Sequence, residues 1–105
     1  MDTSIELNVN NNIVEFIKQY ISLFESFDNV YLFGSVLDVN RMPNDIDLLL
    51  IYSEDLSKIT YELDIIYSVL SKVSGLSIDL TILSAKEEKE TEFIKKINSK
   101  YLKLK

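Results

Sequence analysis

The sequence predicts an α+β domain in which helices flank one mixed sheet of three strands or slightly more. Apolar residues recur at three- and four-residue steps in three segments, as is typical of amphipathic helices. Three shorter segments, rich in apolar and β-branched residues, end at Gly or Ser and are predicted strands. The order helix, strand, strand, helix, strand, helix indicates a single sheet with helices packed on it.

The predicted helices follow from their apolar stripes and their caps. The first ends near Asp28, the second is capped within Ser53–Asp55 and ends at Gly75, and the third opens with a capping box of Ser84 and Glu87. The three stripes, in chain order, are Ile13, Phe16, Ile17, Tyr20, Phe24 and Phe27; Leu56, Ile59, Leu63, Ile66, Tyr67 and Leu70; and Phe93, Ile94, Ile97 and Tyr101.

The predicted strands are Val30–Phe33, Ile46–Tyr52 and Ser77–Leu83. The second is apolar on both faces, which is typical of a central strand. A loop containing Asn40 and the only proline, Pro43, joins the first two strands.

The chain has 105 residues, which predicts one domain over residues 1–105, with residues 1–10 expected to be flexible. Hydrophobic residues make up 47% and charged residues 27%, the balance of a globular protein. No apolar run approaches the roughly 18 residues of a membrane span. The N-terminal residues lack the basic and then apolar order of a signal peptide, so we expect a cytoplasmic location.

Composition also limits the chemistry. The absence of cysteine excludes disulfides and thiolate metal sites, and the absence of histidine removes the usual zinc ligand and the usual general base. Any metal must therefore be bound by oxygen, which favours Mg²⁺ or Mn²⁺ over Zn²⁺. The net charge of −6 argues against generic nucleic-acid binding.

Three aspartates lie in or beside the predicted strands. Asp45 and Asp47 are two residues apart, so their side chains project from one face of a strand and repel each other unless a cation compensates them. Asp79 lies within an apolar strand, where a buried charge needs a partner. Each has an ordinary alternative: a solvated strand start for the pair, and an edge strand facing water for Asp79. The dipeptide of Gly34 and Ser35 is either a turn or a phosphate contact.

Together these residues resemble a known family. The segment Phe33–Ser35, nine intervening residues, then Asp45–Leu48, and later Ile78–Leu80 resemble the nucleotidyltransferase superfamily of the DNA polymerase β type. In particular, the chain is similar to the minimal nucleotidyltransferases. These are small single-domain proteins often found beside a helical HEPN partner in toxin–antitoxin pairs. The resemblance implies a nucleotidyltransferase core.

The resemblance also implies roles for these residues. Asp45, Asp47 and Asp79 would be catalytic and would hold two Mg²⁺ ions, or Mn²⁺, for in-line nucleotidyl displacement. Gly34 and Ser35 would bind the triphosphate of ATP, the expected substrate.

The loop between Ser35 and Asp45 differs from many relatives, which have a basic, glycine-containing loop there. Here Arg41 is the only cation, and it is the remaining candidate for binding the triphosphate, while Asp38 adds a negative charge.

The leading hypothesis is a Mg²⁺-dependent transfer of AMP from ATP to a hydroxyl on a partner, as the antitoxin of a HEPN pair. Because the chain holds only a catalytic core, a HEPN-like protein or a second copy would complete the pocket. Nucleic acid is expected only as an acceptor. The alternatives are a nucleotidyltransferase-fold binding module that neutralises its partner by contact, favoured by the weakly basic loop, and a domain that binds nucleotide without transfer.

The C-terminal segment is basic. Its cations suit the C-terminal end of a solvated helix, which is the interpretation we favour, while phosphate or RNA contacts are the alternative. The lysines concerned are Lys95, Lys96, Lys100, Lys103 and Lys105.

Overall fold

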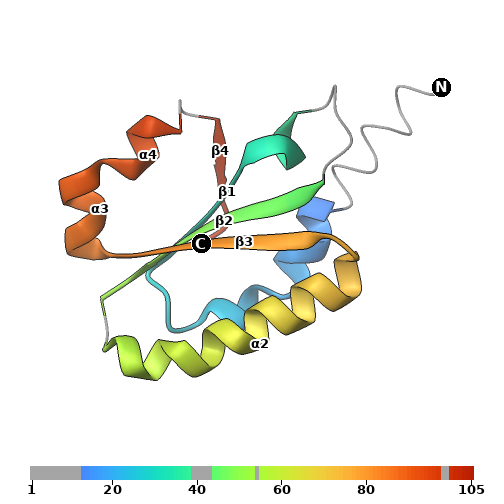
Figure 1. Cartoon of the computed structure of the whole chain (residues 1–105), viewed down its shortest axis with the longest axis horizontal. Helices are drawn as coiled ribbons and strands as arrows, with labels where there is room; N and C mark the ends of the chain where they lie inside the picture. Colours follow the sequence, from blue (N-terminus) through green and yellow to red (C-terminus); the bar gives the residue numbers. More distant parts are fainter. Residues whose placement is uncertain (1–12, 39–43, 54, 98–99) are drawn as a thin grey trace.

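The computed structural model describes residues 13–38, 44–53, 55–97 and 100–105, and these form a four-stranded sheet with helices on both sides (Figure 1). The strand order is β3-β2-β1-β4, so β2 is central, as predicted. β1 pairs antiparallel with β2 and β4, whereas β2 pairs parallel with β3, which makes the sheet mixed. The strands are β1 (Asn29–Phe33), β2 (Asp45–Tyr52), β3 (Ser77–Ser84) and β4 (Tyr101–Lys103). The predicted α+β class is confirmed.

Two of the helices begin at the predicted caps. Asp55 accepts a hydrogen bond from the Ser57 amide, and the helix it caps ends at Gly75, which is in the left-handed conformation. Ser84 and Glu87 form the predicted capping box. The α-helices whose two ends both lie within the described residues are α2 (Leu56–Ser74), α3 (Ala85–Thr91) and α4 (Phe93–Lys96), and the 3₁₀ helices are η1 (Ile21–Phe24) and η2 (Gly34–Leu37). Residues 13–19 are also helical.

The two faces of the sheet differ because strand side chains alternate. One face packs on α2 and η1, where Leu48 is fully buried. The fully buried side chains of this core are Ile17, Phe24, Val30, Leu32, Ile46, Leu48, Leu50, Ile59, Ile66 and Leu70. The other face lies on the side of α3 and α4 (Figure 1). By strand alternation and register, the side chains of Asp47 on β2 and of its partner Phe33 on β1 lie on this face.

The N-terminal helix is shorter than predicted. It was expected to run to near Asp28, but the α-helix ends at residue 19 and a 3₁₀ turn, η1, follows. The amides of Tyr20 and Leu23 bond to carbonyls three residues back, which tightens the chain. The apolar pattern is kept in this tighter path, because Phe24 and Phe27 are still buried.

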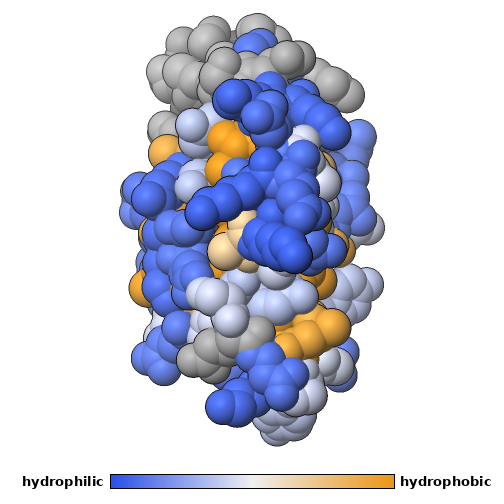
Figure 2. All heavy atoms as spheres, turned by 90° about the vertical axis from the view of Figure 1, so that its left-hand side faces the viewer, coloured by the Kyte–Doolittle hydropathy of each residue, from blue (hydrophilic) through white to orange (hydrophobic). Residues whose placement is uncertain are grey.

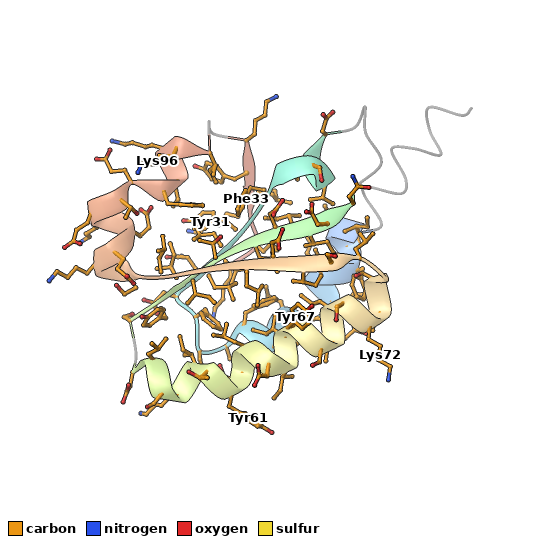
Figure 3. The ribbon with its side chains drawn as sticks, in the orientation of Figure 1. Tyr31, Phe33, Tyr61, Tyr67, Lys72 and Lys96 are labelled. Carbon is orange, nitrogen blue, oxygen red and sulfur yellow. The ribbon has the colours of Figure 1, made fainter. Side chains whose placement is uncertain are left out.

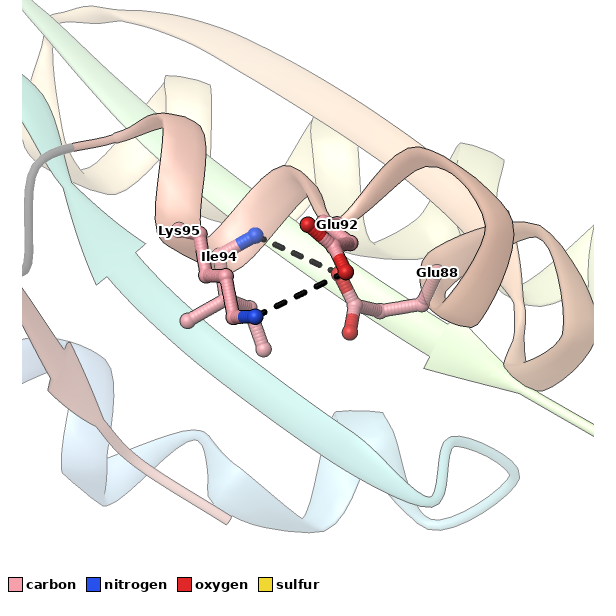
Figure 4. Close-up of polar contacts among 4 residues, drawn as sticks. All are labelled: Glu88, Glu92, Ile94 and Lys95. Atoms are coloured by element: carbon pink, nitrogen blue, oxygen red, sulfur yellow. Dashed lines mark hydrogen bonds and ion pairs between the residues drawn. The ribbon is translucent and has the colours of Figure 1, made fainter.

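The prediction of one C-terminal helix is wrong in two respects. Glu92 takes a left-handed conformation with φ of 51°, which divides the segment into α3 and α4. Figure 4 shows the contacts at this break: the Ile94 amide donates to Glu88 Oε2 at 3.2 Å, and Lys95 Nζ lies 3.5 Å from Glu92 Oε1. Tyr101, expected on the helix, lies instead on β4.

The end of the molecule formed by α3, α4 and the start of α2 is largely hydrophilic, with small apolar patches between the polar side chains (Figure 2). Within the described residues no helix is long and apolar enough to cross a membrane. Two predictions lie outside the described residues: the flexibility of residues 1–10 and the loop containing Asn40 and Pro43.

Candidate metal and nucleotide site

The three predicted aspartates lie together on two adjacent strands. Asp45 and Asp47 open β2 and share a face, and the parallel register makes Asp79 on β3 the partner of Asp47. Each contributes a carboxylate oxygen, and these atoms all lie within 4.8 Å of one another. Asp45 and Asp47 are half-buried, whereas Asp79 on the edge strand is exposed. Asp79 therefore faces water, as its alternative interpretation predicted, and is also a member of the aspartate cluster.

Asp47 is the electrostatic centre of this cluster. Burial raises the pKa of its carboxyl group to about 6, and the charges of Asp45 and Asp79 and a hydrogen bond with Asp79 add to this effect. The ionised form is thus poorly compensated by the residues around it. A divalent cation held by oxygen ligands would supply this compensation, so the residues present fit Mg²⁺ or Mn²⁺.

Gly34 allows the backbone to approach the aspartates closely. Its φ is +85°, a conformation that residues with a side chain rarely adopt. A Cβ at this position would overlap Asp47 Oδ2 and would lie 3.1 Å from Asp47 Cγ. Both the conformation and the space therefore require glycine where β1 meets η2.

Ser35 lies on the opposite side of the aspartate pair from β3. Its hydroxyl donates to Asp45 Oδ1 at 3.5 Å, which is a long hydrogen bond. The structure therefore places Gly34 and Ser35 directly beside the carboxylates. Arg41 lies outside the described residues.

Aromatic rings lie next to the aspartates on the same face. Phe33 on β1 is the register partner of Asp47, and its ring packs edge to face on Phe93 of α4 at 5.8 Å. Tyr31 packs in the same way on Tyr101 of β4 at 5.4 Å. Figure 3 shows Tyr31 and Phe33 on the α3 and α4 side of the sheet.

Sequence reasoning missed this aromatic group because it assigned Phe93 and Tyr101 to one helix. The phenol of Tyr31 is affected by the packing: burial raises its pKa, and the neighbouring Tyr101 and Glu88 add to the shift. The available signal was the alternation of apolar residues after Lys100, but three residues of strand are too short to be recognised without their partner strand.

The mixed sheet and its aspartate cluster define a nucleotidyltransferase-like fold with a candidate cation site. The sequence model of the family described as polymerase beta, nucleotidyltransferase, matches residues 11–103. The chain therefore belongs to this nucleotidyltransferase family. A search of curated proteins found no significant match.

Solved structures show the same fold. One similar chain comes from the complex of the tri-AMPylated Shewanella oneidensis HEPN toxin with MNT antitoxin; it is 16% identical, with a TM-score of 0.54 over 95% of this chain and 71% of that chain. A candidate nucleotidyltransferase from Sulfolobus solfataricus is 15% identical, with a TM-score of 0.51 over 82% of this chain and 78% of that chain. At this identity the likeness establishes the fold.

Proposed function

We propose that this protein is a Mg²⁺-dependent nucleotidyltransferase that moves AMP from ATP to a hydroxyl group of a partner protein. The observation that supports this most directly is the convergence of three carboxylates within 4.8 Å on one face of two adjacent strands. Family membership supports the reaction class. The close approach of Gly34 to Asp47 supports a phosphate site beside them.

Asp45, Asp47 and Asp79 would hold Mg²⁺, with two ions expected and Mn²⁺ as a substitute. When bound, Mg²⁺ neutralises the triphosphate charge and makes the acceptor hydroxyl a better nucleophile. Asp45 and Asp47 orient the nucleotide, since they lie nearest to Ser35 and Gly34.

In the transfer, the acceptor oxygen bonds to the α-phosphorus, the bond from this phosphorus to the bridging oxygen breaks, and pyrophosphate leaves. The hydroxyl proton passes to the exposed Asp79 carboxylate on the outer strand, which an acceptor can reach from solvent. The Gly34 amide and the Ser35 hydroxyl hold the departing phosphates. Carboxylates provide the proton acceptor, since the chain has no histidine.

A HEPN-type protein is the proposed acceptor. The similar solved complex contains an AMPylated HEPN toxin together with an MNT antitoxin, and this chain covers 71% of the matching chain. We infer that this protein acts as the antitoxin of such a pair, with a tyrosine hydroxyl of the partner as the site of modification.

The test is to incubate the protein with labelled ATP, Mg²⁺ and a HEPN-type protein encoded by a neighbouring gene. Wild type should label the partner, and the double variant Asp45→Asn with Asp47→Asn should lose at least about 10³-fold in rate. Asp64→Asn, which changes an exposed aspartate on α2, is the matched control and should retain activity.

Two results would contradict the proposal: no labelling by wild type, or undiminished labelling by the double variant. If the double variant neutralises the partner as well as wild type does and neither transfers label, the contact-only binding module replaces the enzyme.

A further inference from the structure

The basic C-terminal segment lies beside the strand that leads into the candidate site. Residues 93–105 contain five lysines and no acidic residue, in a chain whose net charge is −6. The sequence favoured a solvated helix end for them, but β4 pairs with β1, the strand that leads into Gly34. A lysine-rich segment therefore supplies the strand that pairs with β1, which leads into the proposed phosphate contact.

Two of these lysines are already engaged elsewhere. Lys95 pairs with Glu92 at the turn between α3 and α4 (Figure 4). Lys105 Nζ donates to the carbonyl oxygens of Phe24 and Glu25, at 2.9 and 3.0 Å. These contacts lie away from Gly34, so neither lysine serves a phosphate there.

Position in the fold distinguishes the remaining three lysines, Lys96, Lys100 and Lys103. Lys103 is the partner of Tyr31, two residues before the end of β1. Figure 3 shows Lys96 on the outer side of α4, well separated from Phe33 in this view. Three candidates thus reduce to one, Lys100.

Lys100 lies at the level of the phosphate segment. Tyr101 is the register partner of Phe33, Lys100 directly precedes Tyr101, and Gly34 directly follows Phe33. Lys100 and Gly34 thus each lie one residue beyond the last pair of the antiparallel ladder, at the same end of β1 and β4. Lys100 is exposed, and within the described ranges it forms no ion pair.

The two edge strands of the sheet separate the proposed nucleotide side from the proposed acceptor side. β3, which bears Asp79, forms one edge, and β4 forms the other. Gly34 and Ser35 follow β1, so a triphosphate bound to them lies towards β4. Tyr101 shares the aspartate face through its pairing with Phe33, and 37% of its surface is exposed although its ring packs on Tyr31.

We propose that Lys100 and Tyr101 complete the nucleoside triphosphate site, with Lys100 binding the phosphates beside Gly34 and Tyr101 stacking on the nucleobase. This inference rests on the proposed nucleotidyltransferase function. Lys100 supplies a point charge of the kind that binds phosphate, and an exposed aromatic ring stacks on any base. Lys100 thereby adds a positive charge near a site whose preceding loop has Arg41 as its only cation.

Calorimetric titration with three probes in Mg²⁺ separates the two contacts. Lys100→Gln should weaken binding of ATP and of inorganic tripolyphosphate about tenfold, with AMP unchanged. Lys100→Arg should restore most of the loss. Tyr101→Leu should weaken ATP and AMP about fivefold or more with tripolyphosphate unchanged, and Tyr101→Phe should match wild type.

The matched controls are Lys72→Gln and Tyr61→Leu on α2, which lies across the sheet from the site, and both should bind like wild type (Figure 3). If Lys100→Gln and Tyr101→Leu also bind like wild type, the inference is overturned. The proposed function then still stands where Asp45→Asn with Asp47→Asn abolishes Mg²⁺-dependent ATP binding. If wild type binds no ATP with Mg²⁺, the proposed function itself fails.

Discussion

The two faces of the central sheet show how one strand serves both stability and chemistry. On β2, Ile46, Leu48 and Leu50 are completely buried against α2 and η1, whereas Asp45 and Asp47 alternate with them on the opposite face. The apolar face gains free energy from burial, while the aspartate face holds like charges close together. The candidate site therefore depends on the packed face for its rigidity, and it weakens the fold when no cation is bound.

The largest difference in stability is expected between two variants that place asparagine at adjacent positions of β2. Leu48→Asn would bury an unpaired amide in the core and should destabilise the protein by about 4 kcal/mol or more. Asp47→Asn removes one of the clustered charges and should stabilise the metal-free protein by about 1 kcal/mol. Urea denaturation in EDTA measures both, and a stability loss in Asp47→Asn would contradict this account of the site.

The two glycines provide the next comparison. Gly34→Ala is strained by its positive φ and by overlap with Asp47, so it should cost about 2–3 kcal/mol and abolish Mg²⁺-dependent ATP binding. Gly75→Ala has the same left-handed strain but nothing within 4 Å of the added Cβ, so it should cost about 1 kcal/mol. Gly75→Ala should leave ATP binding unchanged, and equal binding losses in both variants would show that Gly34 has no special position.

The stability of the aspartate face should depend on pH. The pKa of Asp47 is raised from 3.8 to about 6, so the folded protein retains a proton that the unfolded chain releases. Metal-free stability should therefore fall as pH rises from about 4 to 7, by about 1 kcal/mol after screening by solvent.

Mg²⁺ should reverse this trend, because it binds the ionised carboxylate, so its stabilising effect should grow over the same range. Thermal melts at pH 5, 6 and 7.5, with EDTA or Mg²⁺, measure the effect, and Asp47→Asn should lack it. A Mg²⁺ effect independent of pH would contradict the assignment of Asp47.

The smallest effects are expected at the helix caps. Asp55→Ala removes the cap of α2, which carries the buried Ile59 and Ile66, and should lower global stability by about 1 kcal/mol. Ser84→Ala removes the cap of α3, which has no buried residue, so it should mainly increase amide hydrogen exchange in α3. Equal losses of global stability would show that α3 contributes as much to the fold as α2.

The sequence predicted the local features correctly where they depend on nearby residues. The period of α2, the caps at Asp55 and Ser84 and the central position of β2 all follow from short-range patterns. The sequence also identified the three aspartates, because charges in an apolar strand are conspicuous. It placed Tyr101 on a helix, since a three-residue strand is stable only through pairing with β1.

Short-range patterns in the amino acids are enough to set the order of the main helices and strands, the apolar face of each, and which acidic residues are candidates for cation binding. Tertiary pairing determines that Asp47 and Asp79 are partners, that Gly34 touches the aspartate cluster, and that Lys100 lies just before a strand that pairs with β1. This division arises because periodicity and capping act over a few residues, whereas strand register joins positions far apart in the chain through backbone hydrogen bonds and core packing.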